Sequence, residues 1–114
     1  MEAKIKDIFS IAKGKKAIES QIHTDHRYIQ IDDLRNNDSL KFCLKDRRNV
    51  YCSNEDILIA WDGANAGTIG FGIEGAIGST IARLRTQRKD VYIPYIGEFL
   101  RSKSEFLRAN ATGA

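Results

Sequence analysis

The chain has 114 residues, of which 42% are hydrophobic and 29% charged, a composition typical of one soluble globular domain with its own core. The longest apolar run is far too short to span a membrane and the N-terminus lacks the apolar segment of a secretory signal, so we expect a cytoplasmic protein. The net charge of +3 permits nucleic-acid binding without requiring it.

The first half of the chain predicts short elements joined by polar loops. Apolar residues repeat at helical spacing over residues 3–12, which predicts a short helix or turn that Gly14 ends. Residues 15–26 are polar and are expected to form a loop. Short strands are expected after it, at residues 27–31, 40–44 and 49–52.

A glycine-rich segment in the middle of the chain predicts a β-hairpin. The apolar run Ile57–Ala60 ends at Gly and Asn turn residues, and a second β-rich segment covers residues 68–73. Six glycines lie between Gly63 and Gly78. Because glycine weakens a strand, another part of the structure should compensate for them.

The next segment, residues 79–85, alternates as a strand does. We place Ala82 and Leu84 inward with Thr80, which leaves Arg83 and Arg85 on the outer face with Ile81. Since Ile81 and Leu84 then lie on opposite faces, we expect only Leu84 to be deeply buried.

The C-terminal part predicts helix. Pro94 suits a first helical turn, and an apolar stripe follows at Tyr95, Ile96, Phe99 and Leu100. A capping-box pattern predicts a second helix from Lys103. The expected fold is therefore α+β: a twisted, mostly antiparallel β-sheet with Gly-rich hairpin loops, packed with one or two C-terminal helices, in a single domain over residues 1–114.

Signals for catalysis, cofactors and metals are weak. Cys43 and Cys52 lack the spacing of a zinc motif, and His23 and His26 lack the i, i+4 spacing of a helical metal pair. The glycine segment lacks the Gly-Lys-Ser/Thr that opens a helix in phosphate-binding loops. We therefore expect no cofactor, no metal site and no enzymatic activity.

Basic residues gather in three clusters, around residues 13–16, 45–48 and 83–89. The clusters either converge on one DNA-binding surface or lie on separate solvated loops. In the first case, Lys and Arg would contact phosphates, while Asn and Thr from the glycine loop reach base edges. The candidate DNA-binding residues are Lys15, Lys16, Arg47, Arg48, Asn65, Thr68, Arg83 and Arg85, with Lys15, Lys16, Arg83 and Arg85 expected on one face with the glycine loop.

An ordered set of short motifs resembles the target-recognition domain of the specificity subunit of type I restriction-modification systems. The resemblance covers nearly the whole chain. The matching pieces are Gly14-Lys15, Tyr28–Leu34, Asp56–Ala60, Asp62-Gly63, Gly67–Gly70, Tyr95–Ala109 and Ala111–Gly113.

The resemblance implies non-catalytic, sequence-specific recognition of double-stranded DNA. Such subunits carry two recognition domains, and they direct the methylation and restriction subunits through long spacer helices. This chain resembles one recognition domain without the spacer helix. An alternative is a protein-interaction or regulatory fragment of the same system that does not read DNA, and a third is a small enzyme or nucleotide binder that uses the glycine loop.

One consequence concerns association between copies of the chain. We expect the apolar residues of the C-terminal helices to have limited cover and to favour self-association. The residues concerned are Phe99, Leu100, Phe106 and Leu107.

Overall fold

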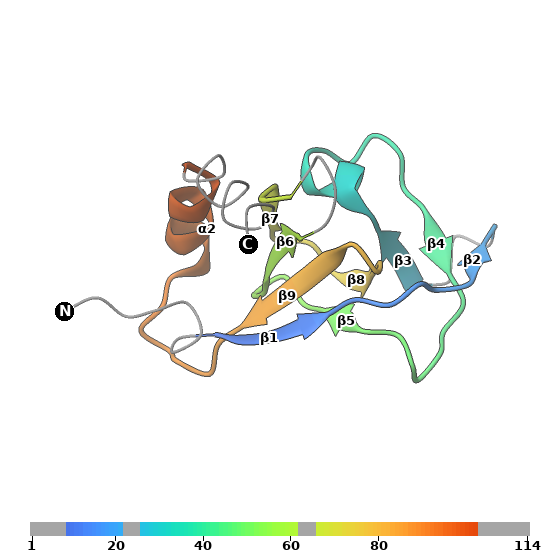
Figure 1. The fold of residues 1–114 in the computed structure, drawn as a ribbon, viewed down its shortest axis with the longest axis horizontal. Helices are drawn as coiled ribbons and strands as arrows, with labels where there is room; N and C mark the ends of the chain where they lie inside the picture. Colours follow the sequence, from blue (N-terminus) through green and yellow to red (C-terminus); the bar gives the residue numbers. More distant parts are fainter. Residues whose placement is uncertain (1–8, 22–25, 62–65, 103–114) are drawn as a thin grey trace.

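The computed structural model describes residues 9–21, 26–61 and 66–102 (Figure 1). Within these ranges short strands dominate, with one 3-10 helix and one α-helix. In chain order the elements are β1 Ser10–Lys13, β2 Glu19–Ser20, β3 His26–Ile29, η1 Ile31–Leu34, β4 Phe42–Cys43, β5 Tyr51–Cys52, β6 Ile57–Ala60, β7 Ile69–Phe71, β8 Gly75–Ile77, β9 Ile81–Arg85 and α2 Ile93–Ser102.

The strands form two sheets. The first has the order β1-β9-β6-β7 and is antiparallel throughout. The second has the order β2-β4-β3-β8-β5, in which only β3 and β8 run parallel. The predicted α+β class with mostly antiparallel strands and a C-terminal helix is confirmed. The division into two sheets was not predicted.

The glycine-rich hairpin is confirmed in β6 and β7, which pair with Ile57 opposite Phe71 and Ile59 opposite Ile69. Gly67 closes the turn at a φ of 93°, in the left-handed region that glycine adopts without strain, and its N–H donates to the Ala60 carbonyl at 2.7 Å. Gly70 faces η1, where a Cβ would lie 2.8 Å from a methyl group of Leu34. Packing of η1 against β7 thus compensates for the missing side chain at Gly70.

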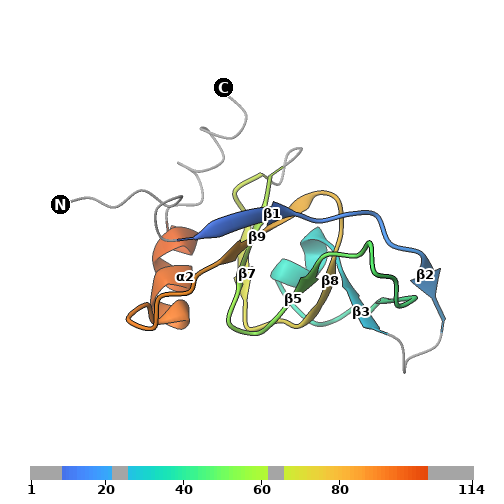
Figure 2. The same ribbon diagram turned by 90° about the horizontal axis from the view of Figure 1, so that it is seen from below.

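The first sheet is covered on both faces. One face packs against α2 through an apolar cluster that includes Ile57, Leu84 and Leu100. The other face packs against the second sheet and η1 through a cluster that includes Leu58, Ile81 and further apolar residues. Figure 2 shows α2 at one end of the molecule and the second sheet at the other.

The expectation that only one of Ile81 and Leu84 is deeply buried was wrong. Ile81 is 0% exposed and Leu84 is 3% exposed. The two side chains point to opposite faces of β9, as the alternation predicts, but a separate core lies on each face. Strand alternation alone cannot tell a sheet covered on one face from a sheet covered on both.

Two other segments differ from their predicted structure. Residues 10–12, predicted as part of a short helix or turn over residues 3–12, lie in β1 beside β9, with Ile11 opposite Leu84. Pairing with a buried strand has overridden the local helical spacing. The strand predicted over residues 27–31 is β3, which ends at Ile29, because residues 31–34 turn into η1.

The C-terminal helix is confirmed as α2, but its buried face differs from the predicted stripe. Gly97 and Leu100 are buried, whereas Tyr95 and Phe99 are 68% and 53% exposed. The helix predicted from Lys103 lies outside the described residues. Within the described ranges, no helix is long and apolar enough to cross a membrane.

Candidate nucleic-acid interface

Two connections that are distant in sequence bring positive side chains together. Lys15 and Lys16 lie between β1 and β2, and Arg48 lies between β4 and β5; all three are exposed. They line one groove of about 270 Å³, together with Ala17, Ile18, Asp46 and Asn49. Two of the three predicted basic clusters therefore meet. We call residues 15–18 and 45–49 the cationic surface.

The first of these connections is fixed to both sheets. The Gly14 N–H donates to the Ile81 carbonyl at 2.8 Å, and the Lys15 N–H donates to the Ile77 carbonyl at 3.2 Å. A Cβ on Gly14 would overlap the carbonyl groups of Ile77 and Gly78, so the chain passes here only because this residue is glycine. Both lysines consequently project from a well-anchored backbone.

The second connection is organised by Asp46. Its carboxylate accepts hydrogen bonds from the Arg48 backbone N–H at 2.8 Å and from the Arg48 guanidinium at 3.1 and 2.9 Å. These bonds lower the pKa of Asp46 to about 2, so it is ionised at neutral pH. Lys15, Lys16, Lys45, Arg47 and Arg48 still outnumber this one carboxylate on the cationic surface.

The expectation that Arg83 and Arg85 lie on an outer face of the strand was wrong. Arg85 donates to the buried carboxylate of Asp56 through Nε at 2.9 Å and Nη2 at 2.7 Å. Arg83 donates through Nη1 to the Tyr51 carbonyl at 2.6 Å. The second sheet covers the face that both arginines share with Ile81. These two arginines connect structural elements, and we leave them out of the proposed phosphate-contacting set.

Of the two candidates from the glycine loop, only Thr68 lies in the described residues, and it does not line the groove of the cationic surface. Asn65 lies outside the described residues. Thr68 is half-buried and lines a separate groove of about 360 Å³ with Leu34, Arg35, Ile69 and Arg101. The structure therefore brings together only part of the predicted set.

Two buried carboxylates were not singled out from the sequence. Asp33 is 2% exposed and accepts from Arg27 at 3.2 Å, from Lys41 at 2.9 Å and from the Gln30 N–H at 2.8 Å. Partial burial lowers the pKa of Lys41, but its bonds to Asp33 and Asp32 outweigh this, so the pKa is raised overall.

The second buried carboxylate, Asp56, is also 2% exposed. Burial raises its pKa, but the hydrogen bonds from Arg85 and the Ser53 N–H outweigh that effect and the pKa falls below its usual value. Its position directly before the apolar run of β6 was the available sequence signal, because a carboxylate at the edge of a buried strand needs a partner.

Cys43 and Cys52 are buried cysteines, and burial raises the pKa of Cys52 to about 11. In the part of the chain that the structure describes, no three His, Cys, Asp or Glu side chains lie close enough to hold a metal ion.

The fold resembles part of the fold of two solved restriction-modification S subunits. The structure superposes on the HsdS subunit from Thermoanaerobacter tengcongensis with a TM-score of 0.71 and 16% identity, covering 93% of this chain and 28% of that one. It superposes on the type I S subunit from M. genitalium with a TM-score of 0.68 and 14% identity, covering 97% and 28%.

The sequence comparison agrees with the fold. The chain is 29% identical over 113 residues to the type I restriction enzyme MjaVIII specificity subunit from Methanocaldococcus jannaschii. The matched region covers 96% of this chain and 27% of that protein. No family model matches the sequence. The predicted resemblance to a specificity subunit is confirmed, and this chain spans about a quarter of the length of the relatives it matches.

Proposed function

We propose that residues 1–114 form a target-recognition domain that binds double-stranded DNA in the cytoplasm, as part of a type I restriction-modification specificity subunit. Its role is recognition, with no catalytic step of its own. Lys15, Lys16, Arg47 and Arg48 contact phosphates. Methylation and restriction subunits are the protein partners of the assembly in which the domain works.

The observation that carries this proposal is the meeting of two basic clusters on a fold shared with specificity subunits. Lysines on the β1–β2 connection lie in one groove with Arg48 of the β4–β5 connection. Five positive side chains against one carboxylate suit a polyanion, because each phosphate contact releases condensed counterions from the duplex. Because hydrogen bonds already hold the backbone of the lysine segment in place, this segment loses less conformational entropy on binding.

The salt dependence of duplex binding tests the proposal. We expect Lys15→Ala with Lys16→Ala to weaken binding and to lower the slope of log affinity against log salt by about two units, roughly one for each lost phosphate contact. Fluorescence anisotropy with a labelled duplex, between about 50 and 200 mM salt, measures this slope.

A matched control removes a positive charge elsewhere. Arg101 lies on α2, paired with Glu98 at 2.7 Å, and Arg101→Gln should leave the slope unchanged. If Arg101→Gln changes the slope by as much for its one charge as the lysine pair does for each of its two, overall charge, and not the cationic surface, governs binding, and the proposal would be wrong.

A second candidate function is protein interaction without DNA reading, and the surface of α2 favours it. Tyr92, Tyr95 and Phe99 are 71%, 68% and 53% exposed and are spaced as one helical stripe. Titration with a methylation subunit in the absence of DNA tests this role. Binding that Tyr95→Gln and Phe99→Gln abolish, in a chain without measurable DNA affinity, would favour it over DNA recognition.

A further inference from the structure

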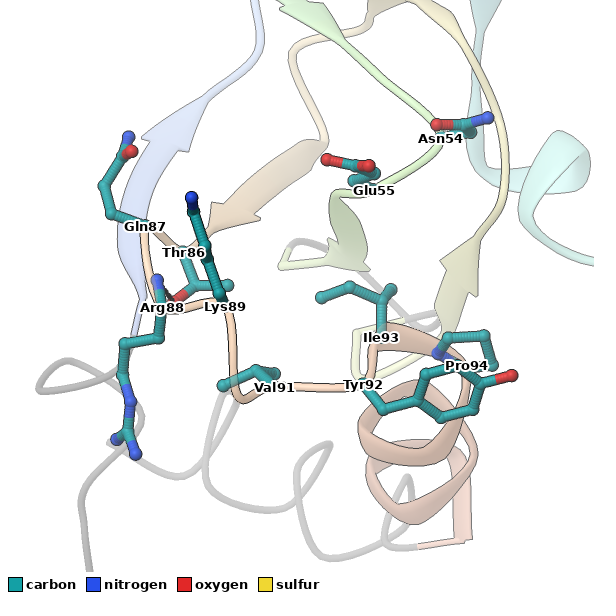
Figure 3. Close-up of a pocket in the computed structure, with 10 residues that line it drawn as sticks. All are labelled: Asn54, Glu55, Thr86, Gln87, Arg88, Lys89, Val91, Tyr92, Ile93 and Pro94. Carbon is teal, nitrogen blue, oxygen red and sulfur yellow. Dashed lines mark hydrogen bonds between the residues drawn. The ribbon is translucent and has the colours of Figure 1, made fainter.

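A second cleft, larger than the groove of the cationic surface, lies beside the β9–α2 connection. It measures about 710 Å³ and lies between the turn of residues 53–56, the β9–α2 connection and the start of α2. Figure 3 shows Asn54 and Glu55 on one side and Thr86, Gln87 and Lys89 on the other. We call this space the polar cleft.

A buried ion pair fixes the two walls of the polar cleft relative to each other. The Asp56 carboxylate accepts from the Ser53 N–H at 2.8 Å within its own turn. It also accepts two hydrogen bonds from Arg85, which directly precedes the wall residue Thr86. Because Asp56 is 2% exposed, its carboxylate is closed to a ligand, and the pair serves to position the walls.

The second wall is also ordered internally. The Arg88 N–H donates to Thr86 Oγ1 at 3.0 Å, and the Arg88 guanidinium bonds Asp90 at 3.0 and 2.6 Å. These bonds organise the turn that presents Gln87 and Lys89. Both walls therefore have a defined geometry before any ligand arrives, which favours specific recognition.

The chemistry of the polar cleft differs from that of the cationic surface. Its side chains include the amides of Asn54 and Gln87, the Glu55 carboxylate and the Lys89 ammonium, all exposed. Asn and Gln pair with the adenine edge, Lys with guanine and Glu with the cytosine amine. Glu55 and Asp90 offset Lys89 and Arg88, so the cleft has little net attraction for phosphate and instead suits base edges.

The chain connects the two surfaces directly. The cationic connection at residues 45–49 leads through β5 into the 53–56 turn of the polar cleft. Figure 1 shows the β4–β5 and β9–α2 connections along the same lower edge of the molecule. A duplex held by its phosphates at the cationic surface can therefore extend along this edge to the polar cleft.

We propose that the polar cleft reads base edges of the bound duplex, with Asn54 and Gln87 as specificity-determining residues. This inference rests on the proposed DNA-binding function. The two surfaces have different roles: the cationic surface supplies affinity that is independent of sequence, and the polar cleft supplies base preference.

The separate roles of the two surfaces can be tested by selecting bound sequences from a random duplex pool, with the full chain at about 50 mM salt. Asn54→Ala with Gln87→Ala should reduce discrimination by roughly 5- to 150-fold at one or more base positions. Its affinity for the unselected pool and its salt slope should match those of the unchanged chain. Gln21→Ala removes an exposed amide outside the polar cleft and should leave the preference unchanged.

The outcomes separate this inference from the proposed function. If the Asn54 and Gln87 variant keeps the original preference, or if the unchanged chain binds DNA with no preference, the inference is wrong while phosphate binding stands. A polar cleft that docks a protein would give the first of these results. If the unchanged chain does not bind DNA under these conditions, the proposed function and the inference fail together.

Discussion

Single buried carboxylates organise the polar parts of this small molecule. Asp33 joins β3 and η1 to Lys41, beside β4, and Asp56 joins the 53–56 turn to the end of β9. In both cases a carboxylate at 2% exposure is paired with cations that keep some contact with solvent. Removing one partner of such a pair leaves a charge with neither water nor a counterion.

Arg85→Ala should therefore destabilise the domain at neutral pH. Asp56 would keep its bonds within the 53–56 turn but lose both guanidinium bonds. We expect a loss of about 3 kcal/mol, at the low end for a broken buried pair because the Arg85 side chain is 38% exposed. Urea unfolding at pH 7 measures it. Arg48→Ala breaks an exposed bidentate pair with Asp46 and, as the control, should change stability little.

The effect of Arg85→Ala should depend on pH with a definite sign. In the unchanged chain the pKa of Asp56 is lowered on folding, so its contribution is present above the unfolded pKa of about 4 and is lost as pH falls through the folded value. Without Arg85, burial raises the pKa of Asp56. The variant therefore loses most stability, relative to the unchanged chain, at pH values where the carboxylate is ionised. The stability difference should shrink between pH 7 and pH 4, and a constant difference would contradict this account.

The elements themselves were predicted from the sequence to different degrees. The β6–β7 hairpin and α2 were predicted because apolar runs, glycine turns and a helix-starting proline are local signals. The structure of residues 10–13 was not, because β1 depends on pairing with β9, some 70 residues away. The roles of Arg83 and Arg85 were missed for a similar reason, since one sequence does not show that a second sheet covers their face.

One glycine in α2 allows the helix to pack closely on the first sheet. Gly97 faces β7, and a Cβ there would overlap ring atoms of Phe71. Replacing a helical glycine with alanine ordinarily gains about 1 kcal/mol of helix propensity. Here the helix must move or the ring must rotate, and overpacking of this kind costs roughly 1–3 kcal/mol.

We therefore expect Gly97→Ala to be net destabilising, by about 1 kcal/mol, in thermal or urea unfolding. The same substitution in a Phe71→Leu background should be neutral or stabilising, because the overlapping ring is gone and the propensity gain remains. If Gly97→Ala costs the same in both backgrounds, Phe71 is not the cause of the glycine requirement.

Across the whole molecule, the cationic surface and the exposed aromatic stripe are separate, but the polar cleft adjoins the stripe. The cationic surface lies on connections between strands and Tyr95 and Phe99 lie on α2, whereas Tyr92 also lines the polar cleft. The sequence predicted an apolar patch on this helix, but its composition differs: Leu100 is buried and Phe106 and Leu107 lie outside the described residues. Association through α2 would therefore leave the cationic surface open.

Tyr92, Tyr95 and Phe99 offer too little area for a stable dimer. Aromatic side chains bury about 150–250 Å² each when fully covered, and these three are already partly covered, so two copies fall short of the roughly 1,000 Å² of a stable interface. We expect weak self-association, visible only at high concentration in sedimentation equilibrium. Tyr95→Gln with Phe99→Gln should abolish it, whereas Leu40→Gln, which changes an apolar residue of similar exposure between η1 and β4, should not. An unchanged chain that stays monomeric at millimolar concentration, or a Leu40 variant that loses association equally, would show that the α2 stripe does not mediate contact between copies.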